Sequence, residues 1–321
     1  MNPEKERLVL GIDVGGTKVC MGVVTENGAS LIIERYPMRM EVFLEDLFEH
    51  IDKMLSEYHD KKQFLGIGIG IKGLVDERKQ MLISSSILQA ASSYDLCGEL
   101  RKRYGLCTAI DNDAHAAAIA ELKFGVGRDC KDFVYVNVGT GTAAGIVCGG
   151  KLVRGHANVA GELGACICER YDEPRLYTLE SVVSGRGLDE EARRLMPRHL
   201  QSNLRKKLSS GEILLSAEIF DACRKGDALA EAVVANALDT LSLAIINMTI
   251  LLNPVLFVFG GGVVTDGWFV EQLDRKVKIL CEETSVAWTA DFQISELGAN
   301  NVGMLGAASI LLEAMEQKAR A

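Results

Sequence analysis

An acidic side chain and a glycine-rich turn follow one another near the start of the chain. Residues 8–14 are mainly apolar, which is typical of a buried strand, yet they include Asp13. The turn that follows consists of Gly15, Gly16, Thr17 and Lys18. Glycines at a hairpin tip let backbone N–H groups approach and hold an anion, while Asp13 could hold a hydrated Mg²⁺ ion. The pattern predicts a phosphate-binding hairpin with magnesium; the alternative is a tight turn beside an edge carboxylate.

A second stretch repeats this pattern. VYVNVGTGTAAGIV at 134–147 aligns with LGIDVGGTKVCMGVV at 10–24, so that Asn137 corresponds to Asp13. Its turn consists of Gly139, Thr140, Gly141 and Thr142. Two copies of one hairpin suggest two related domains whose loops bind one polyphosphate, unless two glycine-turned hairpins are alike by coincidence.

A third glycine group follows a strongly apolar strand. It lies within FGGGVV and includes Gly261 and Gly262. Glycines at this point would let a flat ring lie against the backbone, so an adenine site is one interpretation. A strand-to-helix turn without a ligand is the other.

Three further acids could act on a substrate. Asp113 and its neighbour Asn112 follow an apolar strand and precede an alanine-rich helix. Asp113 could accept the proton of an attacking hydroxyl while Asn112 orients the substrate, and phosphoryl transfer needs little more than that base, a metal ion and in-line positioning. Alternatively, Asp113 caps the helix. Glu162 and Glu180 could accept hydrogen bonds from sugar hydroxyls, or could be solvated surface acids.

Strand-like and helix-like stretches alternate along the chain, which predicts the α/β class. Apolar runs predict strands near residues 8–14, 18–24, 30–35, 65–71, 107–111, 133–138, 143–148 and 255–259. Helical periodicity appears near residues 43–58, 94–104, 113–123, 178–195, 216–223, 228–251, 267–282 and 303–316. Along 65–71, Gly66, Gly68 and Gly70 alternate, and such bare positions are expected to admit a neighbouring backbone.

Composition narrows the functional classes. The 321 residues are 48% hydrophobic and 25% charged, with a net charge of −9 and a pI of about 5.2. An acidic net charge of this kind does not indicate binding to nucleic acid or to an anionic membrane, both of which are negatively charged. Neither a membrane-spanning apolar run nor a signal peptide is visible, and the nine cysteines fit reduced thiols, so a cytoplasmic protein is expected.

The motifs together resemble those of the ROK sugar kinases, within the actin/hexokinase-like ATPase superfamily, and the resemblance covers nearly the whole chain. GIDVGGTK and VGTGTAAGIV resemble the two phosphate motifs, FGGGVV the adenosine motif, and DNDAHAAAIAE the segment with the catalytic aspartate. AGELG, LESVVSG and GIKGLVD resemble sugar-binding segments, and GMLGAA the closing helix. The resemblance implies that Asp113 is the catalytic base and that the substrate contacts are Asn112, Glu162, Glu180 and Gly73.

The resemblance also implies an architecture. It implies two ribonuclease-H-like, actin-like ATPase domains with an interdomain cleft. We place a small N-terminal domain at residues 1–115 and a larger domain at 116–302, with the C-terminal helix 303–321 able to pack on the first. A homodimer is expected, because family members are often dimers or tetramers.

The residues that depart from the family pattern lie in the segments that are expected to bind the sugar. The histidine usual after the E-x-G motif is Ala165, and Tyr177-Thr178 stands where Gly-Cys would complete a zinc motif. Cys166 and Cys168 remain, but tetrahedral zinc needs four ligands, so we expect no zinc site. Lys72 replaces a proline near the expected sugar pocket. These changes could shift the sugar specificity or weaken catalysis.

The resemblance implies an ATP-dependent, glucokinase-like hexose kinase that uses Mg²⁺ and phosphorylates the 6-hydroxyl. A non-catalytic sugar sensor is the alternative, although it would not need Asp113, and only seven residues precede the first strand, too few for a DNA-binding domain. A structural ATPase of the actin type would leave Asn112, Glu162 and Glu180 without a role. The sugar stays open, with hexoses and N-acetylhexosamines both compatible.

Overall fold

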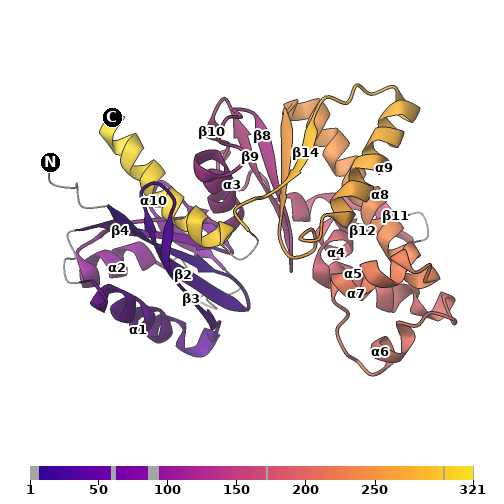
Figure 1. The fold of residues 1–321 in the computed structure, drawn as a ribbon, viewed down its shortest axis with the longest axis horizontal. Helices are drawn as coiled ribbons and strands as arrows, with labels where there is room; N and C mark the ends of the chain where they lie inside the picture. The colour runs from indigo at the N-terminus through magenta and orange to yellow at the C-terminus, as the bar shows by residue number, and fades with distance from the viewer. Residues whose placement is uncertain (1–6, 59–62, 86–93, 171–172, 299–300, 321) are drawn as a thin grey trace. The chain divides into compact units, whose positions relative to one another are not determined.

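The computed structural model describes residues 7–58, 63–85, 94–170, 173–298 and 301–320. The chain forms two compact units, each assembled from separate stretches (Figure 1). Unit 1 comprises residues 1–131, 145–160 and 296–321, and unit 2 comprises residues 132–144 and 161–295. The last helix of the chain therefore belongs to the same unit as the first strand.

Unit 1 is built on a five-stranded sheet with the order β3-β2-β1-β4-β7. The strands are β1 (Leu8–Val14), β2 (Lys18–Thr25), β3 (Ser30–Pro37), β4 (Phe64–Ile71) and β7 (Cys107–Asn112). β1 runs antiparallel to β2 and parallel to β4, and β4 runs parallel to β7. The carboxyl ends of β1, β4 and β7 consequently lie at one edge of the sheet.

Helices cover both faces of this sheet. They are α1 (Phe43–Ser56), α2 (Leu96–Tyr104), α3 (Asp113–Phe124) and α10 (Val302–Arg320). Figure 1 shows α1 and α2 on one face and α10 on the other, where α10 also packs against α3. A small hairpin of β5 (Leu74–Asp76) and β6 (Met81–Ser84) follows β4.

α10 lies directly on β1 and β4 because these strands carry glycines where it crosses them. A Cβ atom on Gly11 would lie 2.3 Å from the Met304 carbonyl oxygen, and one on Gly68 would lie 1.8 Å from that of Ala307. The prediction that the alternating glycines admit a neighbouring backbone is confirmed at Gly68.

The second sheet has the order β10-β9-β8-β13-β14. Its strands are β8 (Phe133–Val138), β9 (Thr142–Cys148), β10 (Lys151–Leu152), β13 (Leu256–Gly260) and β14 (Asp291–Ile294). β13 runs parallel to both β8 and β14. The division between the units falls within β9, after Ala144.

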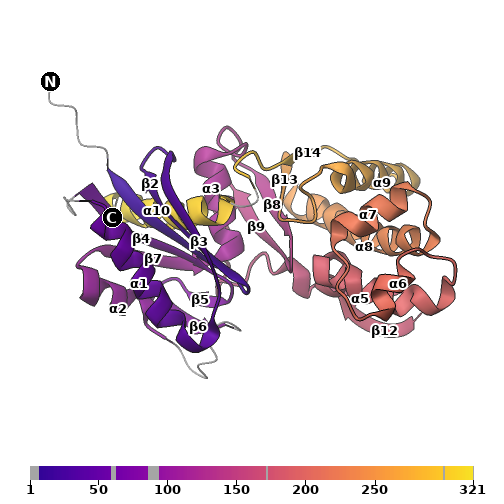
Figure 2. The ribbon, with the colours of Figure 1, turned by 60° about the horizontal axis from the view of Figure 1, so that its bottom comes forward.

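The remaining elements of unit 2 are mainly helical, as Figure 2 shows. The helices are α4 (Glu180–Val183), α5 (Gly185–Leu195), α6 (Arg205–Ser209), α7 (Ser216–Arg224), α8 (Ala228–Leu252) and α9 (Trp268–Thr284). A hairpin of β11 (Ile167–Arg170) and β12 (Glu173–Thr178) precedes them. Within the described residues, α8 alone is long and apolar enough to cross a membrane, and half of its most apolar window is buried inside the protein.

The predicted α/β class is confirmed, and the predicted strands and long helices are present with shifts of a few residues at their ends. The helix predicted over 178–195 is wrong in one respect, because it is interrupted at Ser184. This residue is extended (φ −68°, ψ 163°), and its side chain accepts a hydrogen bond from the Gly187 N–H as the N-cap of α5. The interruption separates Glu180 from the long helix.

Candidate active site

The predicted polar residues of unit 1 lie at or next to the carboxyl ends of three neighbouring strands. The register places Asp13 of β1 beside Gly70 of β4, and Gly70 beside Asp111 of β7. Asp113 follows two residues after Asp111, and its Cα atom lies 3.9 Å from the position of a Cβ on Gly70. A Cβ on Gly70 would also lie 3.2 Å from the Ala116 Cβ, so the absence of a side chain lets the start of α3, with Asp113, pack closely on the end of β4.

Asp13 and Asp113 are electrostatically coupled. Burial raises the pKa of Asp13 to about 7, the negative charge of Asp113 adds to the increase, and Lys18 opposes it. Burial also raises the pKa of Asp113, which Lys72 and a hydrogen bond from the Ala114 N–H counteract. Two partly buried carboxylates near one another hold a proton or a cation more readily than either would alone.

The first glycine hairpin opens from this edge. The Gly15 N–H donates to the Lys18 carbonyl oxygen at 3.0 Å, which closes the turn. Gly16, Thr17 and Lys18 are exposed, and a Cβ on Gly16 would meet no atom within 4 Å. The tip is therefore accessible to a ligand, and it lies directly after Asp13 in the chain.

Asn112, rather than Asp113, is the N-cap of α3. The Asn112 Oδ1 atom accepts hydrogen bonds from the N–H groups of Ala114 and His115, while its Nδ2 group donates to the Gly73 carbonyl oxygen at 3.2 Å. The alternative reading of Asp113 as the cap is therefore wrong. Asp113 is the first residue of the helix, and Asn112 ties it to the predicted sugar segment at Gly73.

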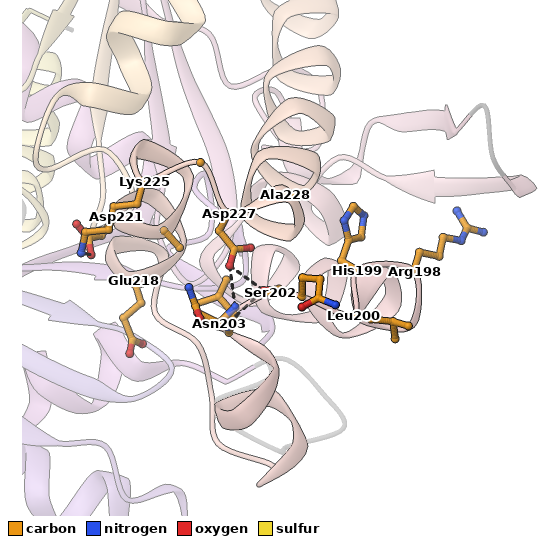
Figure 3. Close-up of a pocket in the computed structure, with 14 residues that line it drawn as sticks. Arg198, His199, Leu200, Ser202, Asn203, Glu218, Asp221, Lys225, Asp227 and Ala228 are labelled. Carbon is orange, nitrogen blue, oxygen red and sulfur yellow. Dashed lines mark hydrogen bonds and ion pairs between the residues drawn. The ribbon is translucent and has the colours of Figure 1, made fainter.

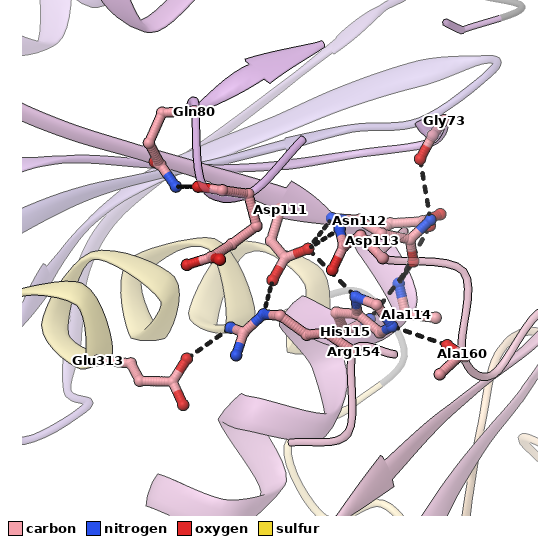
Figure 4. A network of polar contacts seen from close by, with 12 residues as sticks. Gly73, Gln80, Asp111, Asn112, Asp113, Ala114, His115, Arg154, Ala160 and Glu313 are labelled. Carbon is pink, nitrogen blue, oxygen red and sulfur yellow. Dashed lines mark hydrogen bonds and ion pairs between the residues drawn. The ribbon is translucent and has the colours of Figure 1, made fainter. Parts of the chain in front are cut away.

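A buried polar network lies behind Asn112 and Asp113 and was not predicted (Figure 4). Asp111 is fully buried and accepts from His115, Arg154 and Asn158, and Arg154 also donates to Glu313 of α10 at 2.7 Å. Burial would raise the pKa of Asp111, but His115, Arg154 and Asn158 outweigh it and lower the pKa to about 2. The i, i+4 spacing of Asp111 and His115 was the one signal of this network in the sequence.

In unit 2, the second glycine hairpin joins β8 to β9. The Gly139 N–H donates to the Gly141 carbonyl oxygen at 2.9 Å, and the Gly139 carbonyl oxygen accepts from the Gly185 N–H at 2.8 Å. Thr140 is exposed, whereas Thr142 is buried and its hydroxyl has no partner among the described residues. Of the two threonines, Thr140 presents its side chain to solvent.

Glu180 lies beside this hairpin. Its Oε2 atom accepts from the Thr142 N–H at 2.9 Å, and its Oε1 atom lies 3.3 Å from Arg186. Glu162 is exposed and precedes a short 3₁₀ helix, in which a Cβ on Gly164 would lie 2.2 Å from the Thr142 carbonyl oxygen and 3.1 Å from the Glu180 Cβ. The structure thus brings the segment that carries Glu162 next to Glu180.

The glycine turn after β13 reaches the same hairpin. Gly261 has a φ of 96°, and a Cβ there would lie 2.4 Å from the Val138 carbonyl oxygen. A Cβ on Gly139 would lie 3.8 Å from the Gly262 nitrogen. The predicted phosphate and adenosine segments of unit 2 are therefore neighbours.

Cys166 and Cys168 lie on the β11–β12 hairpin or next to it. Cys166 is exposed, and the Cys168 thiol lies 3.6 Å from the Tyr177 carbonyl oxygen. No group of three or more metal-ligating side chains occurs within the part of the chain that the structure describes.

A separate cavity of about 710 Å³ lies in unit 2 between the 198–204 segment, α7 and the turn into α8 (Figure 3). Asp227 of this lining accepts four hydrogen bonds. It accepts from the Ser202 hydroxyl and the Asn203 N–H with one oxygen, and from the first turn of α8 with the other. These contacts make Asp227 a helix cap, and the cavity contains none of the predicted site residues.

Comparison with known proteins gives the family. The model of the ROK family matches residues 9–314, so the chain belongs to the ROK family, as predicted. The chain is 30% identical to the glucokinase of Halalkalibacterium halodurans, with 94% of each chain covered. It is 29% identical to the glucokinase of Thermotoga maritima, over 95% of this chain and 97% of that one.

A solved structure agrees with the fold. The ROK family glucokinase of Streptomyces griseus, crystallised with glucose and AMPPNP, superposes with a TM-score of 0.79 at 27% identity. The match covers 95% of this chain and 99% of that one. The predicted relation to ROK sugar kinases thus holds for sequence and for fold.

Proposed function

We propose that the protein is an ATP-dependent sugar kinase that transfers the γ-phosphate of ATP to the 6-hydroxyl of a hexose, as a glucokinase does. The observation that carries this proposal is the pair Asp13 and Asp113, held at one sheet edge beside an exposed glycine hairpin. The known relatives named glucokinase support the same activity.

Asp113 is the proposed general base. Its position at the start of α3 leaves the carboxylate part-exposed, and its raised pKa brings it closer to neutral pH, where a base accepts a proton more effectively. Asn112 and Gly73 hold the sugar from unit 1. Glu162 and Glu180 of unit 2 accept hydrogen bonds from further hydroxyls.

The two hairpins are the proposed phosphate ligands. One is the segment Gly15, Gly16, Thr17 and Lys18 of unit 1, and the other is the segment Gly139, Thr140, Gly141 and Thr142 of unit 2. The proposed donors are groups other than the N–H groups of Gly15, Gly139 and Thr142, because the hairpins' own hydrogen bonds occupy those three. Gly261 and Gly262 receive the adenosine. Backbone N–H groups that glycines leave uncovered bind phosphate oxygens closely.

The donor set of Asp13 fits Mg²⁺. This ion keeps several waters and binds through one or two carboxylates together with substrate phosphates, so it does not need a cage of three side chains. Asp13 has a raised pKa that a nearby cation would lower. When bound, Mg²⁺ neutralises charge on the phosphates.

A non-catalytic sugar sensor is the second candidate. The residues that favour it are Ala165 and Lys72, which depart from the family pattern in the sugar segments. The decisive experiment is an ATP-coupled assay of the purified protein against a panel of hexoses and N-acetylhexosamines. We expect ATP-dependent phosphorylation of at least one sugar, whereas sugar binding without turnover would establish the sensor.

The same preparation tests the remaining proposals. We propose that the protein is a cytoplasmic homodimer without zinc. Light scattering should give twice the 34.9 kDa chain mass, and metal analysis should find less than stoichiometric zinc. One zinc per chain would contradict the interpretation of Cys166 and Cys168.

A further inference from the structure

His115 is a buried residue of α3 to which the proposed reaction assigns no role. Its side chain is only 2% exposed. The Nδ1 atom lies 3.1 Å from Oδ1 of Asp111, and the Nε2 atom lies 2.9 Å from the Ala160 carbonyl oxygen. A carboxylate and a carbonyl oxygen can only accept hydrogen bonds, so both ring nitrogens must donate and the ring must be an imidazolium.

The charges around the ring agree with this state. The groups that face it or its partner are Asp111 of β7, Arg154 after β10 and Asp113 of α3, and Glu313 of α10 pairs with Arg154. With His115 positive, the set Asp111, His115, Arg154 and Glu313, of which the first two are buried, is neutral overall. Burial alone would lower the pKa of His115. Asp111 and the Ala160 carbonyl oxygen raise it by a larger amount, so the pKa lies above its usual value.

The two ends of the imidazolium bridge lie next to substrate segments. Asp111 also accepts from the Asn112 N–H at 2.8 Å, and Asn112 in turn caps the helix that begins at Asp113. Ala160 precedes Gly161 and Glu162 in the chain. Unit 1 ends at Ala160 in this stretch and unit 2 begins at Gly161, so the imidazolium bridge lies within unit 1.

We propose that His115 is a positioning residue for the sugar, acting as an imidazolium that fixes the Asn112–Asp113 strand end against the Ala160 carbonyl oxygen within unit 1. This inference rests on the proposed sugar contact of Asn112. Loss of a ring proton turns a donor into a lone pair that faces an acceptor, which releases one end of the bridge. The KM for the hexose should therefore rise at alkaline pH, while the KM for ATP stays constant.

His115→Asn tests the proposal, because it keeps a donor near Asp111 but cannot reach Ala160. We expect the hexose KM to increase about 10-fold, as for a buried group left without its partner, and to lose its alkaline rise. His156→Asn is the matched control, since His156 is exposed and lies four residues before Ala160 in the same loop. It should leave both KM values and their pH dependence unchanged.

Wild-type protein supplies a second test that does not depend on a variant folding. In ¹⁵N NMR spectra at pH 7, both ring nitrogens of His115 should carry a proton, and a neutral ring would overturn the proposal. Equal increases of the hexose and ATP KM values in His115→Asn would also overturn it. Glu162→Gln distinguishes failure of the positioning role from failure of the proposed sugar site. If Glu162→Gln raises the hexose KM and His115→Asn does not, the positioning role is wrong and the sugar site stands. If neither variant changes the hexose KM, both proposals are contradicted.

Discussion

The two glycine hairpins have the same strand–turn–strand pattern but different surroundings. The hairpin of unit 1 follows Asp13, whose pKa is raised to about 7, and its tip at Gly16 is unobstructed. The hairpin of unit 2 follows Asn137 and is braced by Gly185 and Glu180, which bond its backbone. One copy lies beside interacting charged groups, and the other is held by a hydrogen bond from the Gly185 N–H and by one to the Glu180 carboxylate.

This difference shows how one repeated motif can serve two purposes. Carboxylates near Asp13 can hold a metal ion and receive a proton, which are steps that require charge. Neutral N–H and hydroxyl donors near Gly139 can bind phosphate oxygens without competing for the cation. We therefore expect the proposed site of unit 1 to depend on its charged groups, and that of unit 2 to depend on the hydrogen bonds of its hairpin.

The largest effect should come from breaking the buried ionic network of unit 1. Asp111→Asn leaves Arg154 and His115 without their charged partner, so we expect the free energy of unfolding to fall by about 3–5 kcal/mol in urea titrations. Asp52→Asn is the control, because its ion pair with Arg103 is half-exposed and should contribute at most about 1 kcal/mol. Similar losses of unfolding free energy in the two variants would show that the network around Asp111 stabilises the protein no more than an exposed ion pair does.

Exchanging the residues that precede the two turns tests the contrast directly. Asp13→Asn should lower kcat with Mg²⁺ and ATP about 100-fold, comparable to the loss of one preorganised charge contact in an active site. Asn137→Asp should instead raise the KM for ATP, because it adds a negative charge beside the phosphate loop. If both variants changed the same kinetic constant, the two hairpins would not differ in role.

Acid should weaken unit 1 through Asp111. Its pKa is lowered from 3.8 to about 2 in the folded protein, so its contribution is fully present above pH 3.8 and is lost as the pH falls through 2. The corresponding loss in the free energy of unfolding is about 2 kcal/mol. Urea titrations between pH 5 and 2 should show this loss in the wild-type protein and a smaller one in Asp111→Asn.

The smallest effect should come from adding a methyl group to each turn. A Cβ on Gly16 would meet no atom within 4 Å, and one on Gly139 would meet none closer than 3.7 Å, so Gly16→Ala and Gly139→Ala should leave the unfolding free energy nearly unchanged. Each should raise the KM for ATP about 10-fold, because the methyl group keeps phosphate from the backbone N–H groups. A change in stability without a change in KM would mean that these glycines serve only the fold.

Local sequence patterns predict much of this molecule. Strands such as β1 and helices such as α8 were predicted within two residues, because their apolar periodicity is strong and their ends are punctuated by glycine or capping residues. The break at Ser184 was missed because apolar residues lie on both sides of it, at Val183 and Leu188, although the intervening Ser-Gly-Arg-Gly is a turn signal; the hydrogen bond from the Gly187 N–H identifies the cap. Short strands such as β14, with few buried positions, gave no clear periodicity.

The proposed site was predictable to the extent that its residues follow strand ends. Asp13 and Asp113 were predicted in this way, and the structure places them near one another. The network around Asp111 was not, because Arg154 and Glu313 come from segments 43 and 202 residues away, and no local pattern links them. Their pairing is a property of how α10 and the loop after β10 pack on unit 1.

The central claim is that Asp113 is the base of an ATP-dependent sugar kinase, and Asp113→Asn tests it most directly. The measurement is the rate of sugar phosphorylation at saturating ATP, together with the Kd for ATP by calorimetry. We predict a loss in rate of about 100-fold to 10,000-fold with an unchanged Kd, since the amide cannot accept the proton but leaves the hairpins intact. A variant that phosphorylates sugar at the wild-type rate, or that loses ATP binding, would contradict the account.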